Sequence, residues 1–129
     1  MEILRTPEEQ FENLPDWPYE PHYSEVPDGD GGTLRIHHAD SGPSDAPTVL
    51  LLHGEPTWGF LYRKIMSGLA DAGIRSLVPD QVGFGKSDKP SNQTDYTYER
   101  HVMWMEKWLE QNSPEKLFFF GQDWGGLIG

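Results

Sequence analysis

The chain has 129 residues, of which 21 are acidic and 10 are basic, so its formal net charge is −11. This length suffices for one small domain, and such acidity disfavours binding to nucleic acids or anionic membranes, because both would repel the chain. The absence of cysteine excludes disulfides and thiolate metal sites, and the lack of a signal peptide or a long apolar run favours a soluble, cytoplasmic protein.

The first fifty residues are predicted to form an irregular segment followed by two strands. Residues 1–31 are rich in proline and aromatic side chains and end near the turn sequence PDGDGG at 27–32. Partial alternation of apolar and polar residues predicts a strand over 33–40. The run TVLLLH at 48–53 is almost continuously apolar, which is typical of a buried strand in a parallel sheet.

A helix, a strand and a glycine-rich loop are expected next. Over residues 58–72, apolar side chains at 61, 65, 69 and 72 recur at helical spacing, and Gly73 suits a C-terminal cap. Residues 74–80 predict a further strand, which the loop QVGFGKSDKP follows. This loop lacks the G-x-x-x-x-G-K-[ST] spacing of a phosphate-binding loop, so we expect no nucleotide cofactor.

The last part of the chain is expected to hold a second helix, over about 98–111, and a final strand at 117–120 that is typical of a buried one. The helix places Trp104 and Trp108 one turn apart on one face, as core side chains. Strands that alternate with helices predict an α/β fold with a mostly parallel sheet. The loops HGEPTW, DQVGFGKSD and GQDWGG all leave strands at the carboxyl edge of that sheet, so we expect them to converge.

The sequence GQDWG at 121–125 places Asp123 between two glycines, directly after the last predicted strand. This is the context of a nucleophile elbow, a strained strand-to-helix turn that usually carries serine. Aspartate is also a common helix cap, but the flanking glycines and the strand favour the elbow. A carboxylate needs no base to attack saturated carbon, where it forms an ester. Asp123 therefore predicts a reaction with an alkyl electrophile, either a carbon–halogen bond or an epoxide.

Hydrolysis of such an ester develops an oxyanion, which two backbone N–H groups usually stabilise. The expected donors are Trp124, which follows the nucleophile, and Glu55, in the loop after the strand at 48–53. The indole N–H of Trp124 donates without accepting, so it also suits a departing halide. A core position is the alternative for any tryptophan, and we assign it to Trp17 and to Trp58, which we expect to begin the first helix.

Two further features of the composition point to no additional site. His37 and His38 are adjacent, but neighbours on a strand face opposite ways and no third ligand is close in sequence, so no metal is expected. The excess of acidic residues fits ordinary solubility or adaptation to salt, since charge balance reports on solubility more than on fold.

Together, the segments LLHGEPTWGFLYRKI, VPDQVGFGKSDKP and GQDWGGLIG resemble the oxyanion loop, the following strand and loop, and the nucleophile elbow of haloalkane dehalogenases, which have the α/β-hydrolase fold. This resemblance, which covers residues 1–129, implies that Asp123 is the nucleophile, that Glu55 and Trp124 are backbone oxyanion donors and that Trp124 binds halide. It implies a small halogenated alkane and water as reactants, halide as product and no cofactor. In the similar subgroup with glutamate here, Glu55 also positions the hydrolytic water, and a tryptophan of the cap is the second halide donor.

Epoxide hydrolases share the aspartate elbow and are the nearest alternative, but they usually have histidine where this chain has Gln122. Dehalogenases are much longer than this chain, and their remaining strands, helical cap, catalytic acid and catalytic histidine follow the elbow. We therefore expect residues 1–129 to be the N-terminal part of a single α/β-hydrolase core domain, inactive without a C-terminal polypeptide. A non-catalytic binding fragment that keeps this half of the fold is the other hypothesis.

Overall fold

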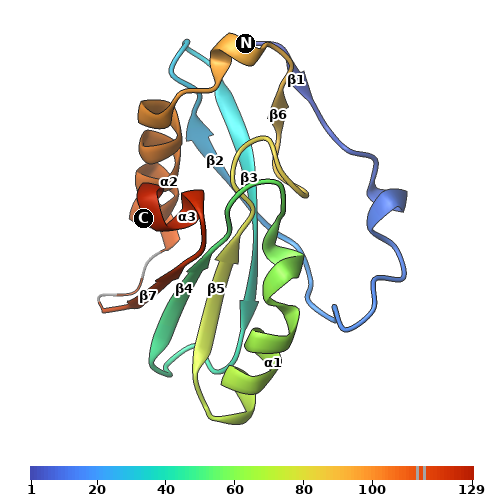
Figure 1. The fold of residues 1–129 in the computed structure, drawn as a ribbon, viewed down its shortest axis with the longest axis vertical. Coiled ribbons are helices and arrows are strands. Elements are labelled where there is room, and N and C mark those ends of the chain that lie inside the picture. The colour runs from blue at the N-terminus through green and yellow to red at the C-terminus, as the bar shows by residue number, and fades with distance from the viewer. Residues whose placement is uncertain (113, 115) are drawn as a thin grey trace.

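A computed structural model, which describes residues 1–112, 114 and 116–129, shows a central β-sheet with helices on both faces (Figure 1). Within these residues, five strands pair in the order β2-β3-β5-β4-β7. Their bounds are β2 His22–Pro27, β3 Thr33–Ser41, β4 Thr48–Leu52, β5 Arg75–Pro79 and β7 Phe118–Gly121. A short antiparallel pair, β1 (Ile3–Leu4) with β6 (Lys89–Pro90), joins the N-terminal segment to the region after β5.

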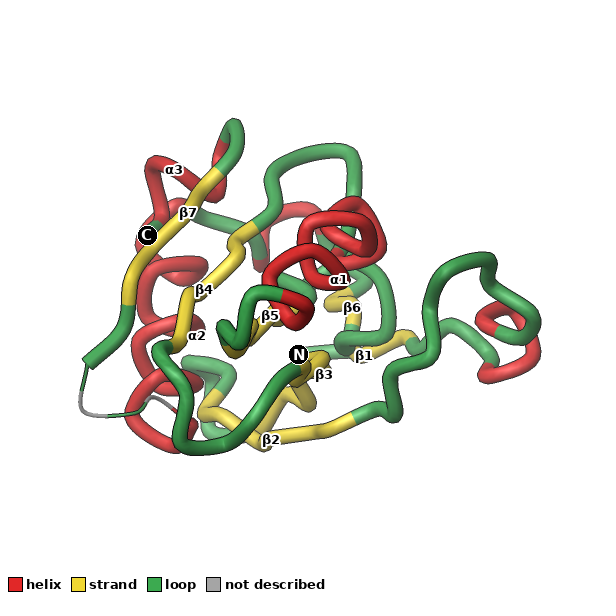
Figure 2. The backbone as a smooth tube through the Cα atoms, turned by 90° about the horizontal axis from the view of Figure 1, so that it is seen from below, coloured by secondary structure: helices red, strands yellow, loops and turns green. Residues whose placement is uncertain are grey.

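The α-helices of the described residues are α1 (Arg63–Asp71), α2 (Tyr98–Asn112) and α3 (Trp124–Ile128). Short 3₁₀ turns lie at η1 (Glu8–Phe11), η2 (Gly59–Tyr62) and η3 (Gln93–Asp95). Helix α1 covers one face of the sheet and α2 the other, with α3 on the same side as α2 (Figure 2). No helix among the described residues is long and apolar enough to cross a membrane.

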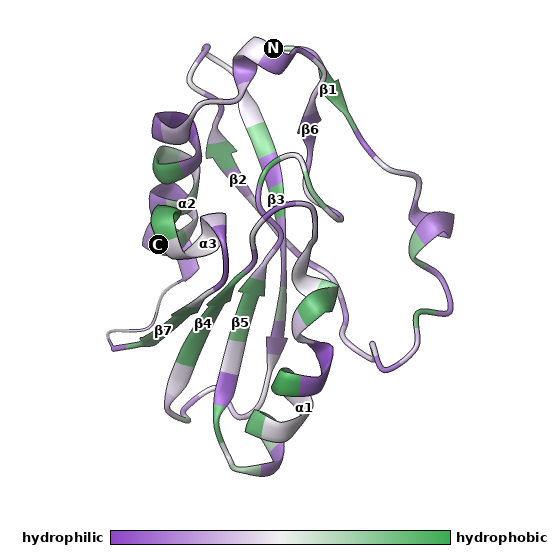
Figure 3. Cartoon of the chain, in the orientation of Figure 1, coloured by the Kyte–Doolittle hydropathy of each residue, from purple (hydrophilic) through white to green (hydrophobic). Residues whose placement is uncertain are grey.

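Strand β4 supplies side chains to the cores on both faces of the sheet. Leu50 and Leu52 belong to the core under α2, whereas Leu51 packs with Met66 of α1. Successive side chains of a strand point to opposite faces, so a strand buried on both faces must be apolar along its whole length. Figure 3 shows this apolar character in β4 and, beside it, in β7.

Several predicted elements are confirmed. The strands expected at 33–40, 48–53 and 74–80 correspond to β3, β4 and β5, and the second helix corresponds to α2. Trp104 and Trp108 are both fully buried on the inner face of α2. Gly73 follows α1 with a φ of 77°, a conformation that glycine adopts readily and that closes a helix.

Of the four apolar positions at helical spacing in the first helix, only Leu69 packs against the core. Leu61 and Ile65 are 39% and 44% exposed, whereas Tyr62 and Met66 are buried. The hydroxyl of Tyr62 donates a hydrogen bond of 2.8 Å to the carbonyl of Leu52, which turns this side chain toward the sheet. Burial at 62 and 66 also follows a helical spacing, so the apolar pattern alone does not distinguish the two faces.

Trp58 does not begin a helix, because its backbone is extended (φ −153°) and η2 starts only at the next residue. Its ring stacks on Phe60 at 5.5 Å and lies 5.9 Å from Trp17. Both tryptophans are half-buried members of this aromatic cluster. Trp17 also packs against the core on the α1 side of the sheet, as expected for a core position.

The N-terminal segment is more regular than predicted, because β2 pairs antiparallel with β3 along its whole length. Only Val26 of β2 is buried, so the sequence HYSEVP lacks the apolar pattern of a strand. Strand β3 also pairs antiparallel with β5, and the parallel part of the described sheet is β5-β4-β7. The described sheet is therefore mixed, with its parallel part next to the elbow.

Strand β7 lies at the edge of the described sheet, where it pairs with β4. Phe118, Phe119 and Phe120 are 72%, 45% and 51% exposed, whereas the sequence predicted a buried strand. The three phenylalanines have the composition of a central strand, and their side chains are exposed because β7 lies at the edge of the described sheet.

Candidate active site

Asp123 lies at the tip of the turn between β7 and α3, where the sequence predicts a nucleophile elbow. Its φ of 56° and ψ of −126° are unusual for a residue with a side chain, and such strain is typical of functional sites. The glycines on either side make the turn possible. A Cβ at Gly121 would lie 2.8 Å from the Cα of Gly126, and one at Gly125 would lie 2.6 Å from the carbonyl oxygen of His53.

The loop HGEPTW at 53–58, which we call the oxyanion loop after its predicted role, meets this elbow although 68 positions separate the two residues in contact. The backbone N–H of Glu55 donates to Oδ2 of Asp123 at 3.1 Å. This hydrogen bond, and a second from the N–H of Trp124, lower the pKa of the Asp123 carboxyl below its ordinary value of 3.8. The approach requires a glycine at position 54, because a Cβ there would lie 2.7 Å from Oδ2 of Asp123. The result is an exposed, ionised carboxylate that two amide donors hold.

The side chain of Asp80 connects the oxyanion loop with the glycine-rich loop that follows β5. The side chain is fully buried and accepts hydrogen bonds from the backbone N–H of Gly59 at 2.6 Å and of Lys86 at 2.9 Å. Its Oδ2 also lies 2.8 Å from Nδ1 of His37, which is buried as well. One carboxylate thus fixes the end of the oxyanion loop, the glycine-rich loop and a side chain of β3.

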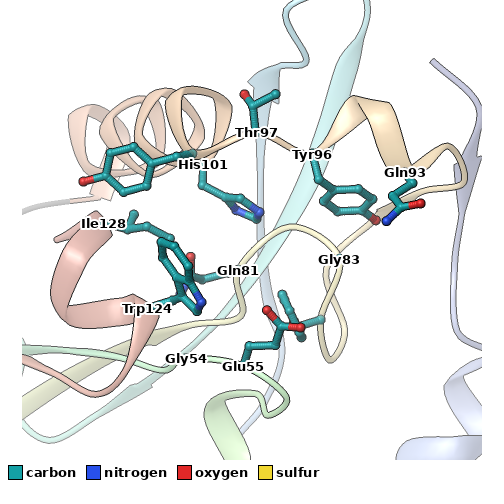
Figure 4. A pocket seen from close by; sticks show the side chains of 12 residues that line it. Gly54, Glu55, Gln81, Gly83, Gln93, Tyr96, Thr97, His101, Trp124 and Ile128 are labelled. Atoms are coloured by element: carbon teal, nitrogen blue, oxygen red, sulfur yellow. The ribbon is translucent and has the colours of Figure 1, made fainter.

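A pocket of about 470 Å³ opens beside the elbow (Figure 4). The indole of Trp124 and the side chain of Glu55 line it from the elbow side, and the rings of Tyr96 and His101 line it from the side of α2. Trp124 is 46% exposed, so its indole is available to a ligand. Burial lowers the pKa of His101, which favours a neutral imidazole in this wall.

Sequence reasoning identified Asp123, Glu55 and Trp124, and the structure brings these residues together at one site. Sequence reasoning did not identify Asp80 or His101. Asp80 directly follows the strand β5, which is a position where polar side chains often serve a site. His101 is predicted only as part of a helix, and the sequence holds no signal that turns it toward the pocket.

The histidines at positions 37 and 38 have separate environments. His37 pairs with Asp80, whereas the ring of His38 lies 5.2 Å from those of His22 and Trp108. Among the residues that the structure describes, no group of three or more His, Cys, Asp or Glu side chains has a geometry that would hold a metal ion.

Comparison with known proteins gives matches along the whole chain. A haloalkane dehalogenase from Psychrobacter cryohalolentis is 55% identical over 129 residues, which are 100% of this chain and 43% of that protein. The solved haloalkane dehalogenase DpaA from Paraglaciecola agarilytica NO2 is 41% identical and has a TM-score of 0.91, over 100% of this chain and 43% of its own.

Solved epoxide hydrolases resemble the chain at a greater distance. One from Vigna radiata is 27% identical with a TM-score of 0.70, over 85% of this chain and 34% of its own. The chain spans 43% of the length of the curated relatives that it matches along its whole length. Residues 47–129, more than half of the chain, match the family described as alpha/beta hydrolase fold. With its strand order, its elbow and this match, the chain belongs to the α/β hydrolase fold family.

Proposed function

We propose that the chain is the N-terminal portion of a haloalkane dehalogenase, which hydrolyses haloalkanes to alcohol and halide through an alkyl ester of Asp123. The observation that carries the proposal is the Asp123 carboxylate, exposed at an elbow and held 3.1 Å from the N–H of Glu55. Relatives named haloalkane dehalogenase match the chain from end to end, which supports the same reading.

In the first step, a carboxylate oxygen of Asp123 forms a bond to the alkyl carbon while the carbon–halogen bond breaks. The halide leaves with the bonding electron pair. The indole N–H of Trp124, on the wall of the adjacent pocket, donates a hydrogen bond to this halide. The carboxylate of Glu55 would repel an anion, so the second halide donor comes from the remaining polypeptide, as the resemblance implies.

In the second step, water attacks the ester carbonyl of Asp123, and negative charge develops on the carbonyl oxygen. The bond between the carbonyl carbon and the alkoxy oxygen then breaks, and the alkoxide takes up a proton and leaves as the alcohol, which restores the Asp123 carboxyl group. The N–H groups of Glu55 and Trp124 already hold this carboxyl group, so they stabilise the charge without rearrangement. The side chain of Glu55 positions the water. The base that removes the proton from the water, its acid partner and the cap belong to a C-terminal polypeptide beyond position 129.

A single turnover of the full-length protein in heavy-oxygen water tests the ester directly. Water attacks the Asp123 carbonyl, so one heavy oxygen should remain in the peptide that contains Asp123 when it is analysed by mass spectrometry. Label in the alcohol alone would mean that water attacks the alkyl carbon, and would overturn the mechanism. The Asp123→Ala variant is the control, and it should release no halide.

Epoxide hydrolysis is the second candidate, because the solved epoxide hydrolases share this part of the fold at a TM-score of about 0.7. Comparing the kcat/KM of the full-length protein for a 1-haloalkane and for a terminal epoxide of equal chain length separates the two. A higher value for the epoxide would favour this candidate. Failure of both substrates to modify Asp123 in the full-length protein would instead favour the non-catalytic binding hypothesis.

A further inference from the structure

His53 is fully buried where β4 enters the oxyanion loop, and both of its ring nitrogens have a backbone partner. Nε2 lies 2.9 Å from the N–H of Gln81, and Nδ1 lies 2.8 Å from the carbonyl oxygen of Gly54. An amide N–H only donates, so Nε2 accepts, and Nδ1 carries the proton and donates to Gly54. Burial lowers the pKa of His53, which favours this neutral ring.

The carbonyl of Gly54 and the N–H of Glu55 belong to the same peptide unit. This unit is planar and trans, so the carbonyl oxygen and the N–H point in opposite directions. A bond that holds the oxygen on one side therefore fixes the direction of the N–H on the other. That N–H is the one that donates to Oδ2 of Asp123 at 3.1 Å.

The rest of the surroundings keep the His53 ring in place. The side-chain amide of Gln81 donates to the carbonyl oxygen of His53, so Gln81 holds both the ring and the backbone of this residue. The ring of Phe84 packs edge-on against the imidazole, with centroids 5.5 Å apart. The loop after β5 thereby fixes the imidazole, and the imidazole fixes the Gly54–Glu55 peptide.

We propose that His53 is a positioning residue for the oxyanion site, which directs the Glu55 N–H toward Asp123 through its own Nδ1–H bond to the Gly54 carbonyl. The effect of His53 on turnover rests on the proposed dehalogenase function. Its effect on the orientation of the Gly54–Glu55 peptide unit does not. A residue with this role acts on the step in which the oxyanion forms, and it leaves substrate binding unchanged.

Two variants of the full-length protein separate this role from general support of the loops. In His53→Asn, the amide nitrogen takes the place of Nδ1 and keeps the donor to Gly54. In His53→Gln, the amide oxygen reaches the place of Nε2 and keeps only the acceptor for Gln81. Each variant loses one of the two ring bonds, so a merely structural role predicts similar losses of stability and activity from both.

In His53→Gln, the Glu55 N–H should no longer be held in the direction of the oxyanion. Complete loss of such a donor lowers kcat by about 10²–10³-fold. We expect at least a tenfold lower kcat for His53→Gln than for His53→Asn, as an order-of-magnitude estimate on the same principle. The ratio kcat/KM should change little, because slower hydrolysis of an accumulating ester lowers KM together with kcat. The alkyl ester of Asp123 should accumulate in the Gln variant, as the mass of the quenched protein shows. Equal kcat values in the two variants would overturn the proposal.

Two measurements work without turnover, so they remain decisive if the dehalogenase function fails. A carbon-13 NMR titration of Asp123 should give a higher pKa in His53→Gln than in wild type, because the Glu55 donor is lost, and His53→Asn should keep the wild-type value. Nitrogen-15 NMR of wild-type His53 should show the proton on Nδ1, as the bond to Gly54 requires, and this measurement needs neither variant to fold. A proton on Nε2, or an Asp123 pKa that is the same in both variants, would refute the role of His53.

Discussion

Replacing Gly54 by alanine should separate the oxyanion loop from the elbow. The added Cβ would lie 2.7 Å from Oδ2 of Asp123 and 2.7 Å from the carbonyl oxygen of Gln122, whereas ordinary contact begins at 3.4 Å. The Cβ of Asp123 would be closer still, so relief requires a shift of more than 3.4 − 2.7, or more than about 0.7 Å, between backbone segments that both belong to tight turns. The Glu55–Asp123 hydrogen bond, now 3.1 Å, would then lengthen beyond bonding distance.

The expected loss follows from the removal of one oxyanion donor, which costs about 10²–10³-fold in kcat. Steady-state halide release by full-length Gly54→Ala measures it, and circular dichroism reports whether the fold persists. Gly68→Ala, in the exposed face of α1, is the matched control, because a Cβ there meets no described atom within 4 Å. A folded Gly54→Ala protein with kcat within about twofold of wild type would refute the reasoning, since such a change is below 1 kcal/mol in the barrier.

Three further substitutions and titrations test other parts of the site. Trp124→Phe removes a charge-assisted hydrogen bond worth about 1.5–3 kcal/mol, so halide affinity, measured by fluorescence quenching, should fall by one to two decades. Hydrogen bonds from Glu55 and Trp124 hold the pKa of Asp123 below its ordinary value of 3.8. Because the carboxylate attacks in its ionised form, the rate of the first halide release should stay constant as the pH is lowered and should fall only below about pH 3.8. Asp80→Ala leaves the donors on Gly59, Lys86 and His37 without their acceptor. Each unsatisfied buried donor costs about 1–3 kcal/mol, so the free energy of unfolding should fall by at least about 3 kcal/mol. The control Asp45→Ala, at an exposed position, should change it little.

The contact between Glu55 and Asp123 is the part of the site that sequence predicts well. Each residue follows a strand of a parallel pair, and such strands end at the same edge of a sheet, so their loops must meet. Glycines at 54, 121 and 125 then mark the places where backbone segments approach closely. These signals are local, and they depend on the backbone more than on the packing of side chains.

The polar junctions behind the site are the part that sequence does not predict. Asp80 and His53 are hydrophilic residues that are fully buried, and each has at least one partner from another loop, Gly59 for Asp80 and Gln81 for His53. Their burial is stable only because each finds several hydrogen bonds, and those partners are known only once the loops are placed in space. The same reason explains the error at α1, where a hydrogen bond from Tyr62 to Leu52 selects one of two apolar faces.

Residues 1–129 by themselves should self-associate through β7. Phe118 is 72% exposed at the edge of the described sheet, and Phe119 and Phe120 are about half exposed on its two faces. An apolar edge strand with unpaired backbone groups is a template for a second chain, and a charge on such a strand opposes that pairing. Sedimentation of the isolated residues should therefore show oligomers whose proportion rises with concentration. Phe118→Lys should shift them toward monomer, whereas Leu61→Lys, on the exposed side of η2, should have little effect, because it leaves the β7 edge unchanged. Equal self-association of the two variants would mean that another surface, and not β7, mediates the contact.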